Sequence, residues 1–140
     1  MKPAFVTLTL ALVLAACQTD LPPPVKGDPA EIYFQRAQAA ADLNEYDKAT
    51  RYYQEFLDNE TQQTHEEAFT ARYELAIIKI KTGRFAEAKK DFEDILADMD
   101  DVNKGAGVPS WIRILSKRKI DDLQDRLAKN SPAPSPAPQP

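Results

Sequence analysis

Two stretches decide the fold of this chain, Asn44-Glu45-Tyr46-Asp47-Lys48-Ala49 and, 39 residues later, Gly83-Arg84-Phe85-Ala86-Glu87-Ala88. Each begins with a residue that accepts the left-handed backbone conformation that ends helices, and continues with an aromatic residue and then an alanine. At the same spacing, residue class also agrees at pairs farther out, small with small and large apolar with large apolar. These pairs are Phe34 and Tyr73, Ala37 and Ala76, Tyr53 and Phe92, Phe56 and Ile95, and Leu57 and Leu96. One register explains every pair, so the chain contains an internal repeat.

Each copy of the repeat is predicted to form two helices around a tight turn. Asp28 and Glu31 can form a capping box at the start of the first copy, and Thr64 and Glu67 can do so in the second. Apolar residues recur at helical spacing after each start. Four helices are therefore expected, over about residues 29–43, 47–58, 64–83 and 86–97.

These residues resemble tetratricopeptide repeats (TPR). In that family an aromatic residue follows the turn, a small residue lets the two helices approach, and a second aromatic residue fills the gap to the next repeat. The resemblance covers residues 29–98, with a period of 39 rather than 34, Arg36 where a leucine is usual, and no proline at the repeat end. It implies an all-α fold, an α-α superhelix with two TPR-like helix-turn-helix repeats at residues 28–60 and 64–98.

Residues 109–129 are predicted to form a C-terminal capping helix. At the 39-residue shift Leu115 falls where Ala37 and Ala76 stood, and a leucine there leaves no room for a close second helix. The apolar residues of this helix are Trp111, Ile112, Leu115, Ile120, Leu123 and Leu127. Its other face is basic, with Arg113, Lys117, Arg118, Lys119, Arg126 and Lys129. That face is expected to be solvated, with anionic lipid or an acidic partner as the alternative.

The N-terminus has the pattern of a bacterial lipoprotein signal. Lys2 precedes an apolar run over residues 4–16, which is shorter than the about 20 residues that a membrane-spanning helix needs. The run ends in Leu14-Ala15-Ala16-Cys17, which resembles a lipobox and holds the only cysteine of the chain. In such lipoproteins the cysteine carries acyl chains, palmitate among them, that anchor the protein to a membrane. An ordinary secretory signal with an incidental cysteine is the alternative.

The segments that flank the repeats are expected to be extended. By resemblance to proteobacterial sorting, Gln18 indicates the outer membrane, facing the periplasm. Residues 17–27 hold three successive prolines and are predicted to be a stiff spacer that lifts the domain off the bilayer. Residues 130–140 alternate with proline and are expected to form a disordered tail. The predicted organisation is a signal peptide at 1–16, a lipidated cysteine and spacer at 17–27, a helical domain at 28–129 and a tail at 130–140.

The composition argues against catalysis, metal binding and nucleic-acid binding. With 18 basic and 22 acidic residues the net charge is −4, so nucleic acid is not an expected partner. Cys17 is assigned to lipid, and the single His65 can supply neither a nucleophile–base pair nor a common zinc ligand set. The acidic stretch 98–107 lacks the EF-hand order and is predicted to be a solvated loop. Neither a cofactor nor a metal is expected.

The resemblance implies a concave protein-binding groove lined by the first helix of each repeat. The lysine and asparagine set that clamps carboxylates in chaperone-binding repeats is absent, since Phe34 and Gln38 occupy those places. An apolar or aromatic-bearing protein segment is therefore the expected partner. Alternatively, Phe34 and Ile80 are simply core. The implied groove residues are Phe34, Gln38, Ala41 and Asp42, then Tyr73, Ile77, Ile80 and Lys81.

The sequence is compatible with three hypotheses about the role of the chain. The first is a membrane-anchored protein–protein interaction adaptor in the bacterial cell envelope, which is not an enzyme. The alternative is a lipoprotein that binds a small apolar ligand and passes it to a transporter. The third is a homodimer in which Trp111 and the basic helix pair two copies.

Overall fold

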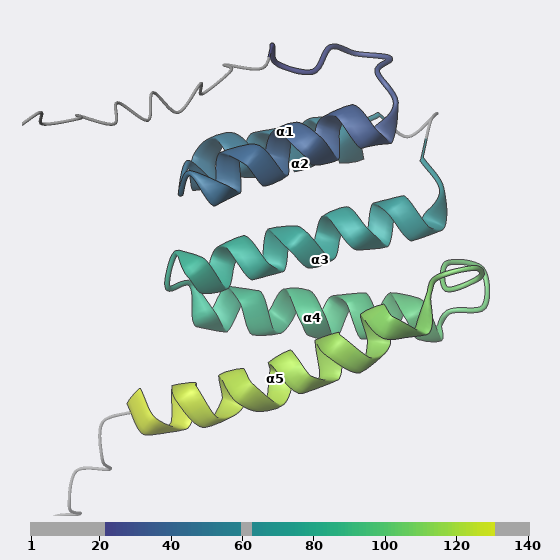
Figure 1. Cartoon of the computed structure of the whole chain (residues 1–140). Helices are drawn as coiled ribbons and strands as arrows, with labels where there is room; N and C mark the ends of the chain where they lie inside the picture. The colour runs from purple at the N-terminus through teal and green to yellow at the C-terminus, as the bar shows by residue number, and fades with distance from the viewer. Residues whose placement is uncertain (1–21, 60–62, 131–140) are drawn as a thin grey trace, which may run out of the picture.

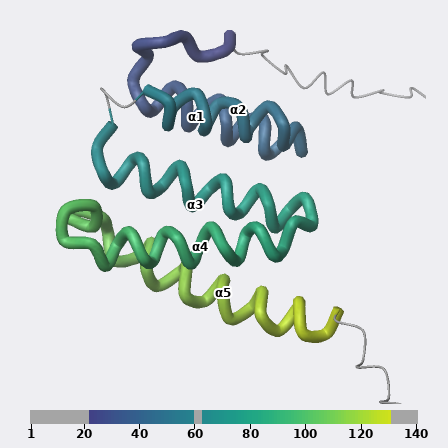
Figure 2. Tube along the Cα trace, turned by 180° about the vertical axis from the view of Figure 1, so that it is seen from behind, coloured from purple at the N-terminus to yellow at the C-terminus, as the bar shows by residue number. Residues whose placement is uncertain are grey.

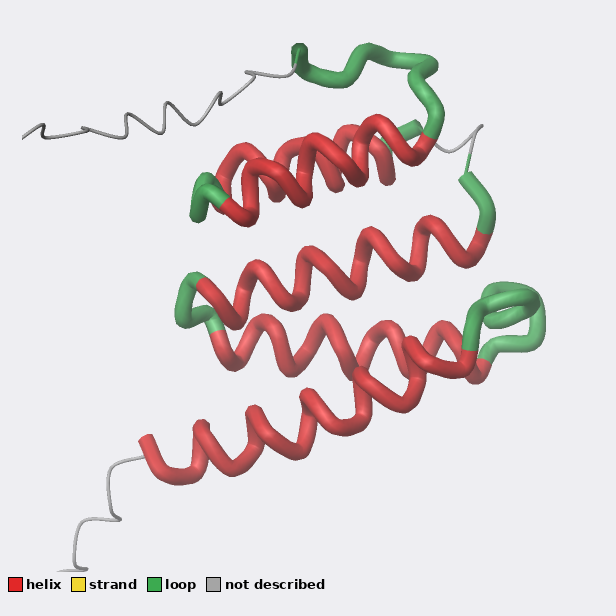
Figure 3. The backbone as a smooth tube through the Cα atoms, viewed as in Figure 1, coloured by secondary structure: helices red, strands yellow, loops and turns green. Residues whose placement is uncertain are grey.

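The computed structural model describes residues 22–59 and 63–130. The predicted signal peptide, Cys17, the first part of the spacer and residues 131–140 lie outside the described residues. Within the described ranges the chain forms five helices and no strand: α1 (Ala30–Asp42), α2 (Tyr46–Leu57), α3 (His65–Lys81), α4 (Phe85–Asp100) and α5 (Ser110–Asn130). The all-α prediction is confirmed. Successive helices run back and forth and stack in chain order, from α1 and α2 at one end to α5 at the other (Figure 1, Figure 3).

The turns inside the two helix pairs have the predicted backbone. Asn44 has a φ of 61° and Gly83 a φ of 78°, the left-handed conformation that ends α1 and α3. The capping box at the start of α3 is also confirmed, since the Glu67 amide donates to Thr64 Oγ1 (3.2 Å) and the Thr64 amide donates to Glu67 Oε2 (2.9 Å). These features are local in sequence, which is why the pattern of residues could indicate them.

The predicted capping box at the start of α1 is wrong. The helix begins after Pro29, and no side chain caps it. Asp28 instead closes a turn on its N-terminal side, because its Oδ2 accepts from the Val25 amide (2.8 Å) and its own amide donates to the Val25 carbonyl (3.0 Å). The carboxylate is therefore used to fold the preceding segment back on the helix.

That segment, residues 22–28, is called the strap here because it lies along the first helix pair (Figure 2). Pro24 is buried. The Tyr33 hydroxyl donates to the Val25 carbonyl (2.9 Å), and Arg36 Nε donates to the Pro22 carbonyl (2.7 Å). The prediction of a spacer that reaches away from the domain is thus wrong for its described part.

Alanines and aromatic residues at equivalent places in the two repeats build the core. Ala37 and Ala49 in the first repeat, and Ala76 and Ala88 in the second, are completely buried where the paired helices approach. Beside them, aromatic rings pack edge to face at the same two repeat positions. The pairs are Phe34 with Tyr53 and Tyr73 with Phe92, each with ring centroids 5.4 Å apart.

Helix α5 packs against α4 and, over a shorter stretch, against α3. The buried small residue at its close approach is Ser116, which is completely buried, while Leu115 is only half-buried. The expectation that a leucine replaces the small residue in this helix is therefore wrong, because the buried small residue is Ser116, one position after Leu115 and 40 positions after Ala76. Among residues 22–59 and 63–130, none of the helices has the combination of length and hydrophobicity that a membrane-spanning helix requires.

Candidate functional site

The residues predicted to line a groove have several different environments. Ala41 and Tyr73 are buried, with 8% and 7% of their surfaces exposed, so assigning them to a groove was wrong. Tyr73 is covered by Trp111 of α5, which packs edge to face on it at 5.6 Å. Sequence reasoning did not indicate this contact, because Trp111 lies 38 positions after Tyr73 in another helix.

Three of the other predicted groove residues are half-buried. Phe34 packs on the first core cluster, where its ring meets Tyr53 and also Phe56 at 5.3 Å. Ile77 and Ile80 pack on the second cluster, which lies between α3, α4 and α5. These side chains thus belong partly to the core, as the alternative interpretation of Phe34 and Ile80 holds, and present the rest of their surface to solvent.

The polar residues of the predicted set are exposed. Gln38 Nε2 donates to Asp42 Oδ1 (2.9 Å), which joins two of them on the surface of α1. Lys81 lies over the ring of Tyr46 at 5.9 Å from its centroid. An equivalent contact occurs one repeat later, where Arg126 lies over Phe85 at 5.7 Å. These cations lie over the aromatic residues that follow the turns. They therefore help to hold successive helices together and also contribute positive charge to the surface.

One pocket is lined by Phe34, one of the residues that were predicted to line a groove. It lies between the first turns of α1 and α3, has a volume of about 430 Å³ and is called the acidic groove here. Its apolar floor comes from Ala30 and Phe34. The full lining is Ala30, Glu31, Phe34, Thr64, Glu66, Glu67 and Thr70.

Two carboxylates beside this floor carry the charge of the acidic groove. Glu31 and Glu66 are exposed, and neither forms an ion pair with any residue in the described part of the chain. Glu67 is occupied by the capping box with Thr64. Both carboxylates lie in the first turns of their helices. An apolar floor flanked by carboxylates is complementary to a segment that combines an apolar residue with a lysine or arginine.

Sequence reasoning missed Glu31, Glu66 and Thr70 as site residues. A usable signal was present for two of them, since Glu31 and Thr70 precede Phe34 and Tyr73 by three residues and so share their helix faces. Glu66 carried no such signal, because its place in the groove depends on how α3 is set against α1.

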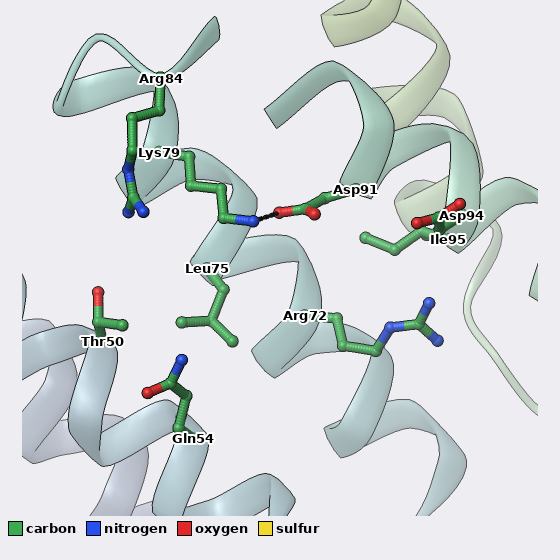
Figure 4. Close-up of a pocket in the computed structure, with 9 residues that line it drawn as sticks. All are labelled: Thr50, Gln54, Arg72, Leu75, Lys79, Arg84, Asp91, Asp94 and Ile95. Carbon is green, nitrogen blue, oxygen red and sulfur yellow. Dashed lines mark ion pairs between the residues drawn. The ribbon is translucent and has the colours of Figure 1, made fainter. Parts of the chain in front are cut away.

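A second pocket, of about 320 Å³, lies between α2, α3 and α4 (Figure 4). Its charged residues are already partnered: Lys79 contacts Asp91 at 2.7 Å, and Arg72 contacts Asp98 at 2.8 Å. A charged ligand would have to compete with these pairs. The lining is Thr50, Gln54, Arg72, Leu75, Lys79, Arg84, Asp91, Asp94 and Ile95.

A polar cluster lies at the contact between the two repeats. Burial raises the pKa of Glu74 above its usual value, and Lys81 partly opposes the shift. Burial also raises the pKa of the Tyr53 hydroxyl, with the charges of Glu74 and Asp42 acting in the same direction. Tyr53 therefore stays neutral and Glu74 is harder to ionise than an exposed glutamate.

The acidic stretch after α4 uses its carboxylates to fold itself. Asp98 binds both Lys104 (2.8 Å) and Arg72, and these hydrogen bonds and charges hold its pKa below the usual value. Asp101 Oδ1 accepts from the Asn103 amide (2.8 Å). Among the described residues, no group of three or more histidines, cysteines, aspartates and glutamates is placed to hold a metal ion.

Comparison with known proteins gives one result. The family model described as "Tetratricopeptide repeat" matches residues 30–62 and 69–97. The first match begins with α1 and contains α2, and the second contains most of α3 and α4. No curated protein and no solved structure matches the chain.

Proposed function

The chain belongs to the tetratricopeptide-repeat family, whose repeats are protein–protein interaction modules, and on that premise we propose a membrane-anchored adaptor that binds a partner through its acidic groove. The observation that carries the proposal is the open floor of Ala30 and Phe34, beside which the carboxylates of Glu31 and Glu66 have no ion-pair partner among the described residues. The partner segment carries an apolar or aromatic residue next to a lysine or arginine. The sequence alone indicated a partner segment with an apolar or aromatic residue. The carboxylates of the acidic groove indicate that this segment also carries a basic residue.

The proposed anchor is Cys17, which carries acyl chains in the outer membrane of a bacterial envelope. Support comes from the sequence, where Leu14-Ala15-Ala16-Cys17 follows a short apolar run. Two or three acyl chains together hold a protein durably on a bilayer. Such an anchor leaves the helical repeats on the aqueous side, facing the periplasm, where the groove is open to other envelope proteins.

Crosslinking in intact cells that produce the full chain, followed by mass spectrometry, tests the adaptor. The groove variant is Glu31→Lys with Glu66→Lys, which reverses two exposed charges and leaves the apolar core unchanged. We expect it to reduce recovery of the specific partner by about tenfold or more, because attraction to the basic residue becomes repulsion. Glu45→Lys with Glu93→Lys makes the same change in net charge outside the groove and should leave recovery unchanged. Equal recovery with both variants would reject the groove as the binding site.

The anchor is tested separately. Cys17→Ser should move the chain from the membrane fraction to the soluble fraction and abolish incorporation of labelled palmitate. If the original chain takes up no label and both chains lie in the soluble fraction, the N-terminus is an ordinary, cleaved secretory signal with an incidental cysteine. The result leaves the groove experiment interpretable in either case.

A further inference from the structure

The outer face of α5 is uncovered in the described structure. Helix α1 is covered by α2 and α3 by α4, whereas α5 lies at the end of the stack with no described helix beyond it (Figures 1 and 2). Two large apolar residues are exposed near the start of α5: Ile114, with 58% of its surface exposed, and Trp111, with 38% exposed although its ring also packs on Tyr73. Such exposure near the start of one helix is unusual for a chain whose other aromatic rings are mostly packed.

Six of the exposed residues of α5 form a regular line, called the seam here. They follow one another at alternating spacings of three and four residues, the pattern with which one helix lies along another. All are exposed in the structure. The seam is Trp111, Ile114, Arg118, Asp121, Asp125 and Ala128.

From this pattern we infer that two copies of the chain pair through α5, antiparallel about a two-fold axis. In the register that overlaps the two helices along their full length, about 30 Å, Arg118 of each copy lies opposite Asp121 of the other. By symmetry this forms two ion pairs. The same register sets the large Trp111 opposite the small Ala128, and Ile114 opposite Asp125. Parallel pairing would instead place Arg118 beside Arg118 and Asp121 beside Asp121.

The charges needed for this pairing are available. Neither Arg118 nor Asp121 forms an ion pair within the described part of its own chain. Arg118 can also reach Asp125 of the second copy, which lies one turn beyond Asp121. A single pair of helices buries less surface than a standard protein interface, so the association is weak in solution. Attachment of both copies to one membrane would favour it by raising their local concentration.

Two differently tagged full-length copies, co-expressed and crosslinked in intact cells, test the pairing. Recovery of the second tag with the first measures it. Arg118→Glu in both copies should reduce recovery by about tenfold or more, because each ion pair becomes a repulsion on both sides of the axis. Asp121→Arg in both copies should do the same. One copy with Arg118→Glu and the other with Asp121→Arg should restore recovery, because opposite charges again face each other.

Matched controls separate the seam from general charge effects and from the groove. Lys90→Glu and Asp47→Arg make the same charge changes on exposed residues of other helices and should leave recovery unchanged. The groove variant should also leave it unchanged, so failure of the adaptor proposal does not decide this one. Circular dichroism of each variant should show unchanged helix content. The inference is overturned if the original copies are not recovered together, if either single variant pairs as the original does, or if the mixed pair is not restored.

Discussion

The rings of Tyr73 and Trp111 meet edge to face, with centroids 5.6 Å apart and planes at 81°. Tyr73 meets Phe92 on another side at 5.4 Å, so one side chain of α3 joins α4 and α5. This contact explains why Tyr73 belongs to the core although its repeat position indicated a groove. The second repeat and α5 therefore form one packed unit.

Tyr73→Ala is expected to destabilise the domain by about 3 kcal/mol, because it leaves a cavity and removes two ring contacts. Tyr73→Phe keeps the ring and should cost less than about 1 kcal/mol. The free energies of unfolding in urea, followed by circular dichroism, measure both effects. Equal losses for the two variants would show that the hydroxyl, and not the ring, matters at this position.

The close approach of α3 and α4 predicts that Ala76 tolerates no larger side chain. Ala76→Leu should cost about 1–3 kcal/mol, since the site is completely buried and the helices must separate. Ala86→Leu makes the same change on an exposed position of α4 and should be nearly neutral. Thermal unfolding of the two variants gives the comparison. Similar melting temperatures would contradict the packing described for the second repeat.

The strap should loosen when its hydrogen bonds are removed. Tyr33→Phe removes the donor to the Val25 carbonyl and should cost about 1 kcal/mol locally. We expect trypsin to cleave after Lys26 several times faster in this variant, because the chain there detaches more often. Tyr46→Phe is the control, since its hydroxyl donates only to nearby Asn44 (2.6 Å). An unchanged cleavage rate for Tyr33→Phe would mean that this hydrogen bond does not hold the strap.

Replacing the half-buried Glu74 by glutamine is expected to stabilise the domain, by an amount that depends on pH. Its pKa is higher in the folded than in the unfolded chain, so ionisation opposes folding as the pH rises above 4.5, the ordinary value. Glu74→Gln should therefore raise the melting temperature at pH 7, by about 2–5 °C, and bring little gain below pH 4.5. Asp98→Asn should show the opposite sign, a loss at pH 7 that fades in acid, because the pKa of Asp98 is lowered. A gain for Glu74→Gln that does not change with pH would exclude ionisation as its cause.

Local patterns predicted the repeats well. Asn44, Gly83, the Thr64 capping box and the recurring alanine and aromatic positions all depend on residues within one or two turns of each other. The strap could not be predicted, because Arg36 and Tyr33 bind backbone carbonyls, which no residue pattern marks.

The register of α5 and the groove were missed for a related reason. The small residue of α5 is Ser116, because this helix is shifted by one residue relative to the 39-residue period. The groove depends on how α1 and α3 lie against each other, which brings Glu66 beside Phe34 although 32 positions separate them. Contacts of this kind depend on tertiary packing, which the periodicity of the sequence alone does not predict.

Site-specific photo-crosslinking can determine whether the partner binds in the acidic groove. A photoreactive amino acid in place of Thr70, which lines the acidic groove, should capture one partner protein in intact cells. The same amino acid in place of Thr50, which lines the pocket between α2, α3 and α4, should not capture it. We expect the Thr70 product to disappear when Glu31→Lys and Glu66→Lys are added, because the groove then repels the basic residue of the partner. Capture from the Thr50 position alone, or a Thr70 product that survives the charge reversal, would contradict it.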